Sequence, residues 1–524
     1  MAQVIIDNSG SEPAVIPAAT GPLTDGKTTA IEMHQAAANA FASGDKGKAV
    51  DILESALQIW PNNAWLIGEL GGVLIELNRK GAGIAMLTLA CSLQKEKGVE
   101  DWRHWSTLGS ALESIEQRDL ARQAFDEAIR VDPNQSDIWD QISGTYVNDG
   151  QPDMCITAAR KALDLRPDNA IAKKHLALGL LEKGEWAEAW PHMEARKQVR
   201  DYTRPKYDMP DWHGEQVDTL IVHGEQGIGD EIMYLSLVHR FRGRAKRLIC
   251  EVTPRLVALM RRSLGELGVE VYASLAEVAA NGGMDIADAE PKKLHSSGID
   301  LSHIAIAGDR KPSIVSCASL PYVLAIGRTQ VRSSGYLMAD PVRVNYWREK
   351  LLTEAKGRPI VGIAWEGGVR KTHKKVRNPP FELWQPLVGD TRYCWVSVQY
   401  THGEIANKAM PGTLHYQQAI DDLDEQAALI SALDMLVSVP QTAVHIAGAL
   451  GVPTLAVVSS KPRWDFCSPD TDMPWWQSVQ MIKQSGSDWT AVFSQLTEML
   501  ERRLRPGSAG GVKDAPSPDT IAAQ

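Results

Sequence analysis

Two acidic residues, Asp230 and Glu231, stand where a short apolar segment gives way to a predicted helix. The segment T-L-I-V-H (219–223) runs into H-G-E-Q-G-I-G-D-E, so both acids fall in the first turn of that helix. A carboxylate there can accept a proton from a hydroxyl group, which makes Asp230 a candidate general base. The same carboxylate can instead cap the helix and stabilise the positive end of its dipole. Gly227 and Gly229 would let an acceptor approach this turn closely.

A phosphate is expected at a different turn, because two acids would repel it and the glycine spacing fits no phosphate-binding fingerprint. The sequence P-Q-T-A-V-H-I-A-G follows the apolar segment 435–439 and opens a helix without an acid. N–H groups near Gln441, Thr442 and Ala443, with the Thr442 hydroxyl, can bind the diphosphate or nucleoside monophosphate of a donor. The alternative is an ordinary buried helix, in which His445 is a structural histidine and not a donor-binding group.

Basic residues gather in the loop E-G-G-V-R-K-T-H-K-K-V-R, directly after the apolar segment 359–365. If the loop overhangs a cleft, its cations can neutralise a leaving phosphate or a sugar carboxylate. A charge run is also typical of a solvated surface, and this alternative stays open. The donor-binding candidates of this region are Trp365, Gly367, Arg370, Lys371, Lys374 and, after the next apolar segment, Gln399.

Asp422 and Asp424 form a D-x-D, which in some sugar transferases holds a divalent metal. A helix follows directly, so capping is the simpler interpretation. Neither a Ser-His-Asp arrangement nor an H-E-x-x-H motif is evident. We therefore expect no metal site.

The overall composition excludes several classes of protein. Lys+Arg 55 against Asp+Glu 65 gives a net charge of −10, which argues against general nucleic-acid binding. No apolar run approaches the ~20 residues that span a bilayer, and no secretory signal is visible. Six cysteines without a C-x-x-C pair are typical of reduced thiols. These features predict a cytoplasmic protein of two to four domains.

The secondary-structure elements predicted to position these residues follow two sequence patterns, one of alternating strands and helices and one of helical repeats. Between residues 201 and 500, short apolar strands alternate with helices, and the predicted strands are 219–223, 247–252, 269–273, 359–365, 393–399, 435–439 and 454–458. Two such halves, 201–340 and 341–500, predict two Rossmann-like lobes with a cleft at the carboxyl ends of their strands.

Residues 29–200 carry the signature spacing of tetratricopeptide repeats. Five units begin near residues 30, 64, 102, 136 and 170. Small residues such as Gly109 allow the two helices of a unit to approach closely, and the units stack into a solenoid. Residues 1–28 and 501–524 have no period and are predicted to be disordered.

Four segments together resemble bacterial tetratricopeptide-repeat glycosyltransferases whose catalytic part is related to the lipopolysaccharide heptosyltransferases. They are P-D-W-H-G-E, H-G-E-Q-G-I-G-D-E, V-G-I-A-W-E-G-G and L-I-S-A-L-D-M-L-V-S-V-P-Q-T-A-V-H-I-A-G-A-L-G-V-P-T. The resemblance implies a TPR solenoid followed by an α/β GT-B fold, with the nucleotide-sugar donor on the C-terminal lobe. It also implies that Asp230 is the base and that neither a metal nor a resident cofactor is required. The turn Pro440-Gln441-Thr442 lacks the Asp-Thr that is common in heptosyltransferases, which argues against an ADP-heptose donor.

The repeats favour a macromolecular acceptor. The inward positions of the first two units form an apolar trough suited to an amphipathic helix, with His34, Phe41, Trp65 and Ile75 as acceptor-binding candidates. Within the resembling family, flagellin glycosyltransferases transfer nonulosonic acids such as pseudaminic acid to flagellin Ser/Thr, which makes a CMP-linked sugar one candidate donor. The N-terminal segment or a second chain could instead fill the trough. Two other functions remain: a non-catalytic adaptor with a degenerate GT-B region, and an envelope-polysaccharide transferase.

Overall fold

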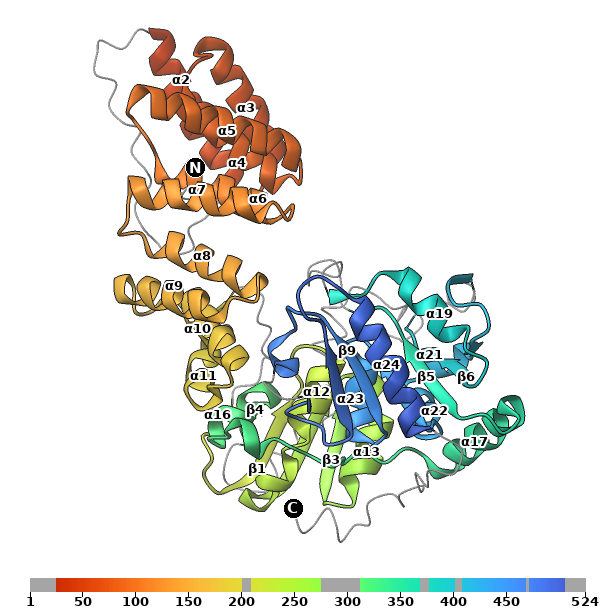
Figure 1. The fold of residues 1–524 in the computed structure, drawn as a ribbon. Helices are drawn as coiled ribbons and strands as arrows, with labels where there is room; N and C mark the ends of the chain where they lie inside the picture. Colours follow the sequence, from red (N-terminus) through yellow and green to blue (C-terminus); the bar gives the residue numbers. More distant parts are fainter. Residues whose placement is uncertain are drawn as a thin grey trace. The chain divides into compact units, whose positions relative to one another are not determined.

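The computed structural model of the protein describes residues 25–199, 209–274, 312–367, 377–400, 408–467 and 471–504. The chain divides into two compact units, residues 1–176 and 177–524. The first consists of antiparallel helix pairs (Figure 1). Its described helices are α2 (Asp25–Ala42), α3 (Lys46–Ile59), α4 (Ala64–Glu76), α5 (Lys80–Lys97), α6 (Trp102–Glu113), α7 (Arg118–Val131), α8 (Ser136–Asn148) and α9 (Pro152–Leu165), and α10 (Ala170–Lys183) begins in it.

The helix pairs follow the predicted 34-residue period because small residues stand where two helices touch. A Cβ atom at Gly109 of α6 would lie 2.5 Å from the ring of Phe125 in α7. Ala121 and Ala128 of α7 are fully buried at the same contact. Side chains also fix the helix starts, since Asp45 accepts a hydrogen bond from an N–H in the first turn of α3. The predicted helical solenoid is therefore confirmed.

The second unit contains, in its described part, a sheet of four parallel strands in the order β3-β2-β1-β4. These strands are β1 (Val217–His223), β2 (Ala245–Val252), β3 (Val269–Ala273) and β4 (Ser313–Ser316). The register pairs Leu220 with Leu248 and with Ser313. Outside β4, the backbone of Trp212 bonds to Ile314, so the segment before β1 packs along this sheet in extended form.

A second described sheet has six parallel strands in the order β10-β9-β8-β5-β6-β7, that of a doubly wound sheet. Its strands are β5 (Ile360–Ala364), β6 (Cys394–Ser397), β7 (Leu414–His415), β8 (Met435–Ser438), β9 (Thr454–Val458) and β10 (Val479–Lys483). All seven predicted strands are present. The sequence missed β4, β7 and β10, of which β7 has only two residues.

Helices surround these sheets (Figure 1). The helices of the second unit that bear on the site are α11 (Trp186–Met193), α12 (Ile228–Leu235), α13 (Val257–Gly265), α22 (Leu423–Ser431) and α23 (Thr442–Ala449). Further helices in the described part of this unit are α16 (Leu320–Val323), α17 (Pro341–Ala355), α19 (Trp384–Val388), α21 (Gln417–Asp421) and α24 (Thr490–Arg503). Residues 25–28 and 501–503 are helical, although the sequence assigned them to disordered ends.

Part of the core is a tryptophan cluster, formed by Trp186, Trp190, Trp464 and Trp475. The ring of Trp186 lies 5.5 Å from that of Trp464 and 5.7 Å from that of Trp475. The indole N–H of Trp190 donates to the carbonyl of Ile326 at 2.9 Å. The cluster therefore binds α11, a helix of the last repeat, to the α/β region.

Candidate functional site

The two predicted acids at the N-terminus of α12 differ in how deeply they are buried. Asp230 Oδ2 accepts the N–H of Gly227 at 3.2 Å and so caps the helix, while 12% of its side chain is exposed. Glu231 is completely buried and accepts hydrogen bonds from the N–H and the hydroxyl of Thr253. Between them and β1, Gln226 adopts a positive φ of 71°, an unfavourable conformation for a residue with a side chain. Glu231 is thus structural, and Asp230 is the more exposed of the two acids.

The loop that leads into α12 is held by a buried ion pair. Arg196 donates from Nε and Nη2 to the two oxygens of Glu225, at 2.7 and 2.8 Å. Burial alone would raise the pKa of Glu225, but the hydrogen bonds and charge of Arg196 hold it below its ordinary value. Arg196 also donates to the hydroxyl of Ser319 at 2.8 Å. This network fixes the carboxyl edge of the first sheet next to Asp230.

The N-terminus of α23 lies at the carboxyl edge of the second sheet. Thr442 and Ala443 open the helix, so their N–H groups have no intrahelical acceptor. Gln441 and Thr442 are half-buried, whereas His445 is buried. The loop after β5 touches this turn, because a Cβ atom at Gly367 would lie 2.5 Å from the carbonyl oxygen of Pro440. Only a glycine leaves room for that approach.

The two helix tips meet. A Cβ atom at Gly229 would lie 3.1 Å from Cδ2 of His445 and 3.7 Å from Cα of Thr442. Figure 1 shows α12 and α23 side by side between the sheets. Nη1 of Arg463 donates to Oδ1 of Asp230 at 2.8 Å. The acid-bearing and acid-free tips therefore share one site, which Arg463 borders.

A charged network continues from Arg463 to the middle of α23. Arg463 donates from Nε and Nη2 to the two oxygens of Asp465, at 2.6 and 2.7 Å. Nε2 of His445 lies 3.3 Å from Oδ2 of Asp465, and the indole N–H of Trp476 donates to Nδ1 of His445 at 3.3 Å. Burial would raise the pKa of Asp465, but Arg463 and His445 hold it well below its ordinary value. His445 thus acts structurally in the described site.

The loop after β5 is fixed by amide side chains. Gln399 Oε1 accepts the N–H groups of Trp365 and Glu366, both at 3.0 Å, and its Nε2 donates to the carbonyl of Glu366. Asn378 Oδ1 accepts the N–H of Gly367 at 3.0 Å. Because the Gln399 side-chain amide is engaged with the backbone, its contribution to a donor site is to hold this loop. Trp365 is 7% exposed and packs in the core of the sheet.

The basic residues Arg370, Lys371 and Lys374 lie outside the described residues. Sequence reasoning missed the cation that does border the site, Arg463. The segment S-S-K-P-R-W-D directly follows β9. A cation at the carboxyl end of a predicted central strand was the signal that could have found it.

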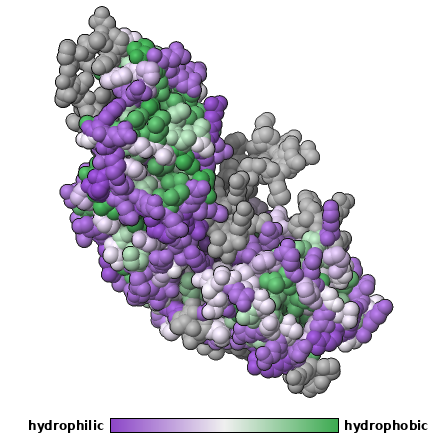
Figure 2. Space-filling model, turned by 45° about the horizontal axis from the view of Figure 1, so that its top comes forward, coloured by the Kyte–Doolittle hydropathy of each residue, from purple (hydrophilic) through white to green (hydrophobic). Residues whose placement is uncertain are grey.

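The predicted acceptor residues lie in the packing of the solenoid. His34 is 5% exposed and its ring contacts Trp65 at 4.0 Å, while Phe41 and Trp65 are each 8% exposed. Ile75 is half-buried and faces Gly83 of the neighbouring helix. These residues do not form the open trough that the sequence suggested, because adjacent helices fill the space. On the face drawn in Figure 2, hydrophobic side chains still gather over the helical repeats, between hydrophilic borders.

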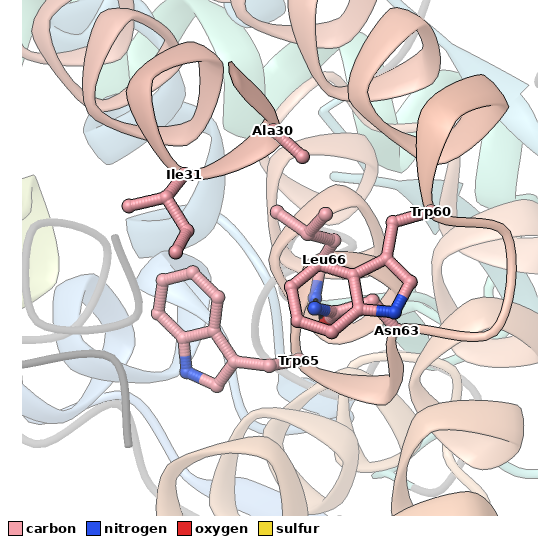
Figure 3. Close-up of a pocket in the computed structure, with 6 residues that line it drawn as sticks. All are labelled: Ala30, Ile31, Trp60, Asn63, Trp65 and Leu66. Carbon is pink, nitrogen blue, oxygen red and sulfur yellow. Dashed lines mark hydrogen bonds between the residues drawn. The ribbon is translucent and has the colours of Figure 1, made fainter. Parts of the chain in front are cut away.

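A small, shallow pocket opens beside Trp65 (Figure 3). It is lined by Ala30, Ile31, Trp60, Asn63, Trp65 and Leu66. Ile31 points toward the Trp65 indole, and the amide oxygen of Asn63 is occupied as the cap of α4. The pocket is therefore apolar in character.

The D-x-D is structural in the described protein. Asp422 caps α22, and Asp424 forms an ion pair with Arg262 of α13. Within the described residues, no group of three or more His, Cys, Asp or Glu side chains is placed to hold a metal. Across the same part of the chain, we find no helix of the length and apolarity needed for a membrane span.

Comparison with known proteins identifies the repeats. A family model described as Tetratricopeptide repeat matches residues 105–135 and 136–169. The chain is similar to Protein FlbA of Caulobacter vibrioides, with 25% identity over 459 residues that cover 84% of this chain and 73% of FlbA. An alignment of that extent runs beyond the repeats and into the α/β unit.

Solved structures similar to this chain cover about a third of it. The crystal structure of MamA is 22% identical, with a TM-score of 0.28, and covers 31% of this chain and 92% of MamA. MamA 41-end from Desulfovibrio magneticus RS-1 is 19% identical, with a TM-score of 0.30, and covers 34% of this chain and all of that chain. The family model thus supports tetratricopeptide repeats, and the structure adds an α/β region with parallel sheets.

Proposed function

We propose that this protein is a cytoplasmic, metal-independent glycosyltransferase of the GT-B type that transfers a sugar from a nucleotide-sugar to a hydroxyl group of a protein. The observation that carries the proposal is the meeting of two helix tips, α12 with Asp230 and α23 without an acid, at the carboxyl edges of two parallel sheets. Ligands of doubly wound sheets bind at such edges. The two tips supply opposite electrostatic environments within one site.

The donor binds at the second sheet. The N–H groups of Thr442 and Ala443 face the phosphate of the nucleotide, and the positive end of the α23 dipole stabilises the charge that develops on it. The loop at Gly367 lies against the same turn, and Gln399 holds that loop in place. A nonulosonic acid carried by CMP is the donor that the resemblance suggests.

The reaction places Asp230 as the general base. Its carboxylate takes the proton of the acceptor hydroxyl while the hydroxyl oxygen bonds to the anomeric carbon and the bond from that carbon to the phosphate breaks. Asp230→Asn keeps the shape of the side chain and removes its charge. We expect it to reduce kcat by about 10²–10⁴-fold with intact folding.

The repeats bind the acceptor protein. Tetratricopeptide solenoids bind protein segments, and flagellin Ser/Thr is the acceptor that the resemblance suggests. The test is intact-mass analysis of purified flagellin incubated with the full chain and CMP-pseudaminic acid, with Asp230→Asn as control. A mass increase of one sugar residue that requires Asp230 is expected. An unchanged acceptor mass with this and with UDP-, GDP- and ADP-linked sugars would refute flagellin as the acceptor.

A non-catalytic adaptor is the second candidate function, favoured by the absence of an acid in the turn Pro440–Thr442. An adaptor shows no thermal stabilisation by any nucleotide-sugar, whereas a transferase is stabilised by its donor. An envelope-polysaccharide transferase predicts sugar transfer to a glycan instead of flagellin. The same mass analysis of glycan and protein acceptors separates these alternatives.

A further inference from the structure

Asp230 is engaged on both oxygens. Its Oδ1 accepts from Nη1 of Arg463 at 2.8 Å, and its Oδ2 accepts the N–H of Gly227 at 3.2 Å. A hydroxyl group that approaches this carboxylate must therefore displace one of two donors. The Gly227 contact belongs to the helix cap and is fixed by the backbone, so the side chain of Arg463 is the donor that can leave.

Arg463 is anchored on one side only. Its Nε and Nη2 are held by Asp465, which is completely buried, while Nη1 alone reaches Asp230. The Arg463 side chain is 31% exposed, against 12% for Asp230. Part of the Arg463 side chain is thus open to solvent, while its partner in the ion pair, Asp465, is buried.

The position where a phosphate would bind adjoins this pair. The tip of α23 touches Gly229, with 3.7 Å from a Cβ atom built there to Cα of Thr442, and Gly229 precedes Asp230 in the chain. A short movement of the Arg463 side chain would therefore let Nη1 donate to either of two anions, the Asp230 carboxylate or the nucleotide phosphate. Guanidinium groups bind phosphate oxygens strongly and with defined geometry.

We propose that Arg463 is shared between Asp230 and the nucleotide, so that donor binding releases the base. Without a nucleotide, Nη1 of Arg463 is hydrogen-bonded to Oδ1 of Asp230. When the nucleotide phosphate binds, Nη1 of Arg463 donates to the phosphate instead, and Oδ1 of Asp230 becomes accessible to the acceptor hydroxyl. The proton of that hydroxyl then passes to Asp230, and the negative charge left on the phosphate is held by Arg463. This inference rests on the proposed function and adds an order to it, donor before acceptor.

The sharing predicts that Asp230 and the nucleotide compete for one cation. We would measure the Kd of CMP, UDP, GDP and ADP by titration calorimetry for the wild type, Asp230→Asn, Arg463→Gln and the double variant. Asp230→Asn should bind the preferred nucleotide about tenfold more tightly, since the phosphate no longer displaces an ion pair. Arg463→Gln should bind it about tenfold more weakly. In the Arg463→Gln background, Asp230→Asn should have little further effect.

The matched control is Asp424→Asn, which removes a buried carboxylate that pairs with Arg262 of α13 and not with Arg463. It should leave the nucleotide Kd unchanged. Unchanged or weaker binding by Asp230→Asn overturns the inference, as does equal tightening in both backgrounds, which would indicate charge repulsion without sharing. If none of the four nucleotides binds the wild type, the proposed function fails as well. Should Arg463→Gln not fold, Arg463→Gln with Asp465→Asn keeps a neutral hydrogen-bonded pair for the same comparison.

Discussion

Asp465 is the buried anion on which Arg463 and His445 depend. It is completely buried and accepts two hydrogen bonds from Arg463, at 2.6 and 2.7 Å. Replacing it by Asn removes the negative charge and leaves Arg463 without its buried counter-ion. Loss of one partner of a buried pair destabilises a protein by about 3–5 kcal/mol.

The expected change in Tm follows from the size of the unit. About 260 residues of this unit, residues 177–524, are described, and proteins gain about 2.1 cal/mol/K of unfolding entropy per folded residue. A loss of about 3–5 kcal/mol therefore lowers Tm by about 5–9 °C. Differential scanning calorimetry of the full chain measures this, with the transition of residues 1–176 as internal reference.

The control for Asp465→Asn is Asp472→Asn. Asp472 pairs with Arg332 at 2.8 Å, but the two side chains are 49% and 40% exposed. A surface pair of this kind contributes about 0–1 kcal/mol, so Tm should fall by about 2 °C at most. If Asp465→Asn shifts Tm no more than Asp472→Asn does, the buried pair does not stabilise the site and our reasoning about it is refuted.

Three further predictions concern packing, pH and metal. Gly109→Ala places a methyl group 2.5 Å from Phe125 and should destabilise the solenoid by about 1–3 kcal/mol in urea denaturation, whereas Gly81→Ala meets no atom within 4 Å and should not. Burial raises the pKa of Asp140 to about 7, so the stability it contributes is present below its unfolded pKa of about 3.8 and lost as the pH rises through 7. The Asp140→Asn variant should therefore be more stable than the wild type by on the order of 4 kcal/mol at pH 8 and equally stable near pH 4. Equal differences at both pH values would contradict this. EDTA should leave sugar transfer unchanged, and inhibition that Mg²⁺ reverses would contradict the metal-free site.

The repeats and most strands could be predicted from the sequence because their signals are local. Tetratricopeptide spacing repeats every 34 residues, and central strands of a parallel sheet are continuous apolar runs. The strand β7 escaped notice because two residues carry no pattern, and β4 because it follows a segment without apolar periodicity. Such elements form when neighbouring strands offer them a partner, which no local window contains.

The sequence predicted the turns that form the site, but it did not predict which side chains contact one another there. The helix starts at Asp230 and Thr442 follow from glycine and polar residues after apolar strands. That Arg463 bonds to Asp230 depends on contact between residues 233 positions apart in the chain. The burial of His34 and Trp65 was also missed, since an inward position can face either solvent or an adjacent helix. Whether His445 contacts a ligand or an internal acid is decided by the same tertiary packing.

The tryptophan cluster determines where the chain can be divided into exchangeable parts. Trp186 belongs by period to the last repeat, yet its indole packs against Trp464 and Trp475 of the α/β region. Truncation near residue 200 would remove Trp186 from the α/β region and expose the rings of Trp464 and Trp475, which would promote aggregation. An exchange of repeats between related chains would succeed only upstream of Ala170, so that the fifth repeat stays with the α/β region and the first four can vary with the bound protein.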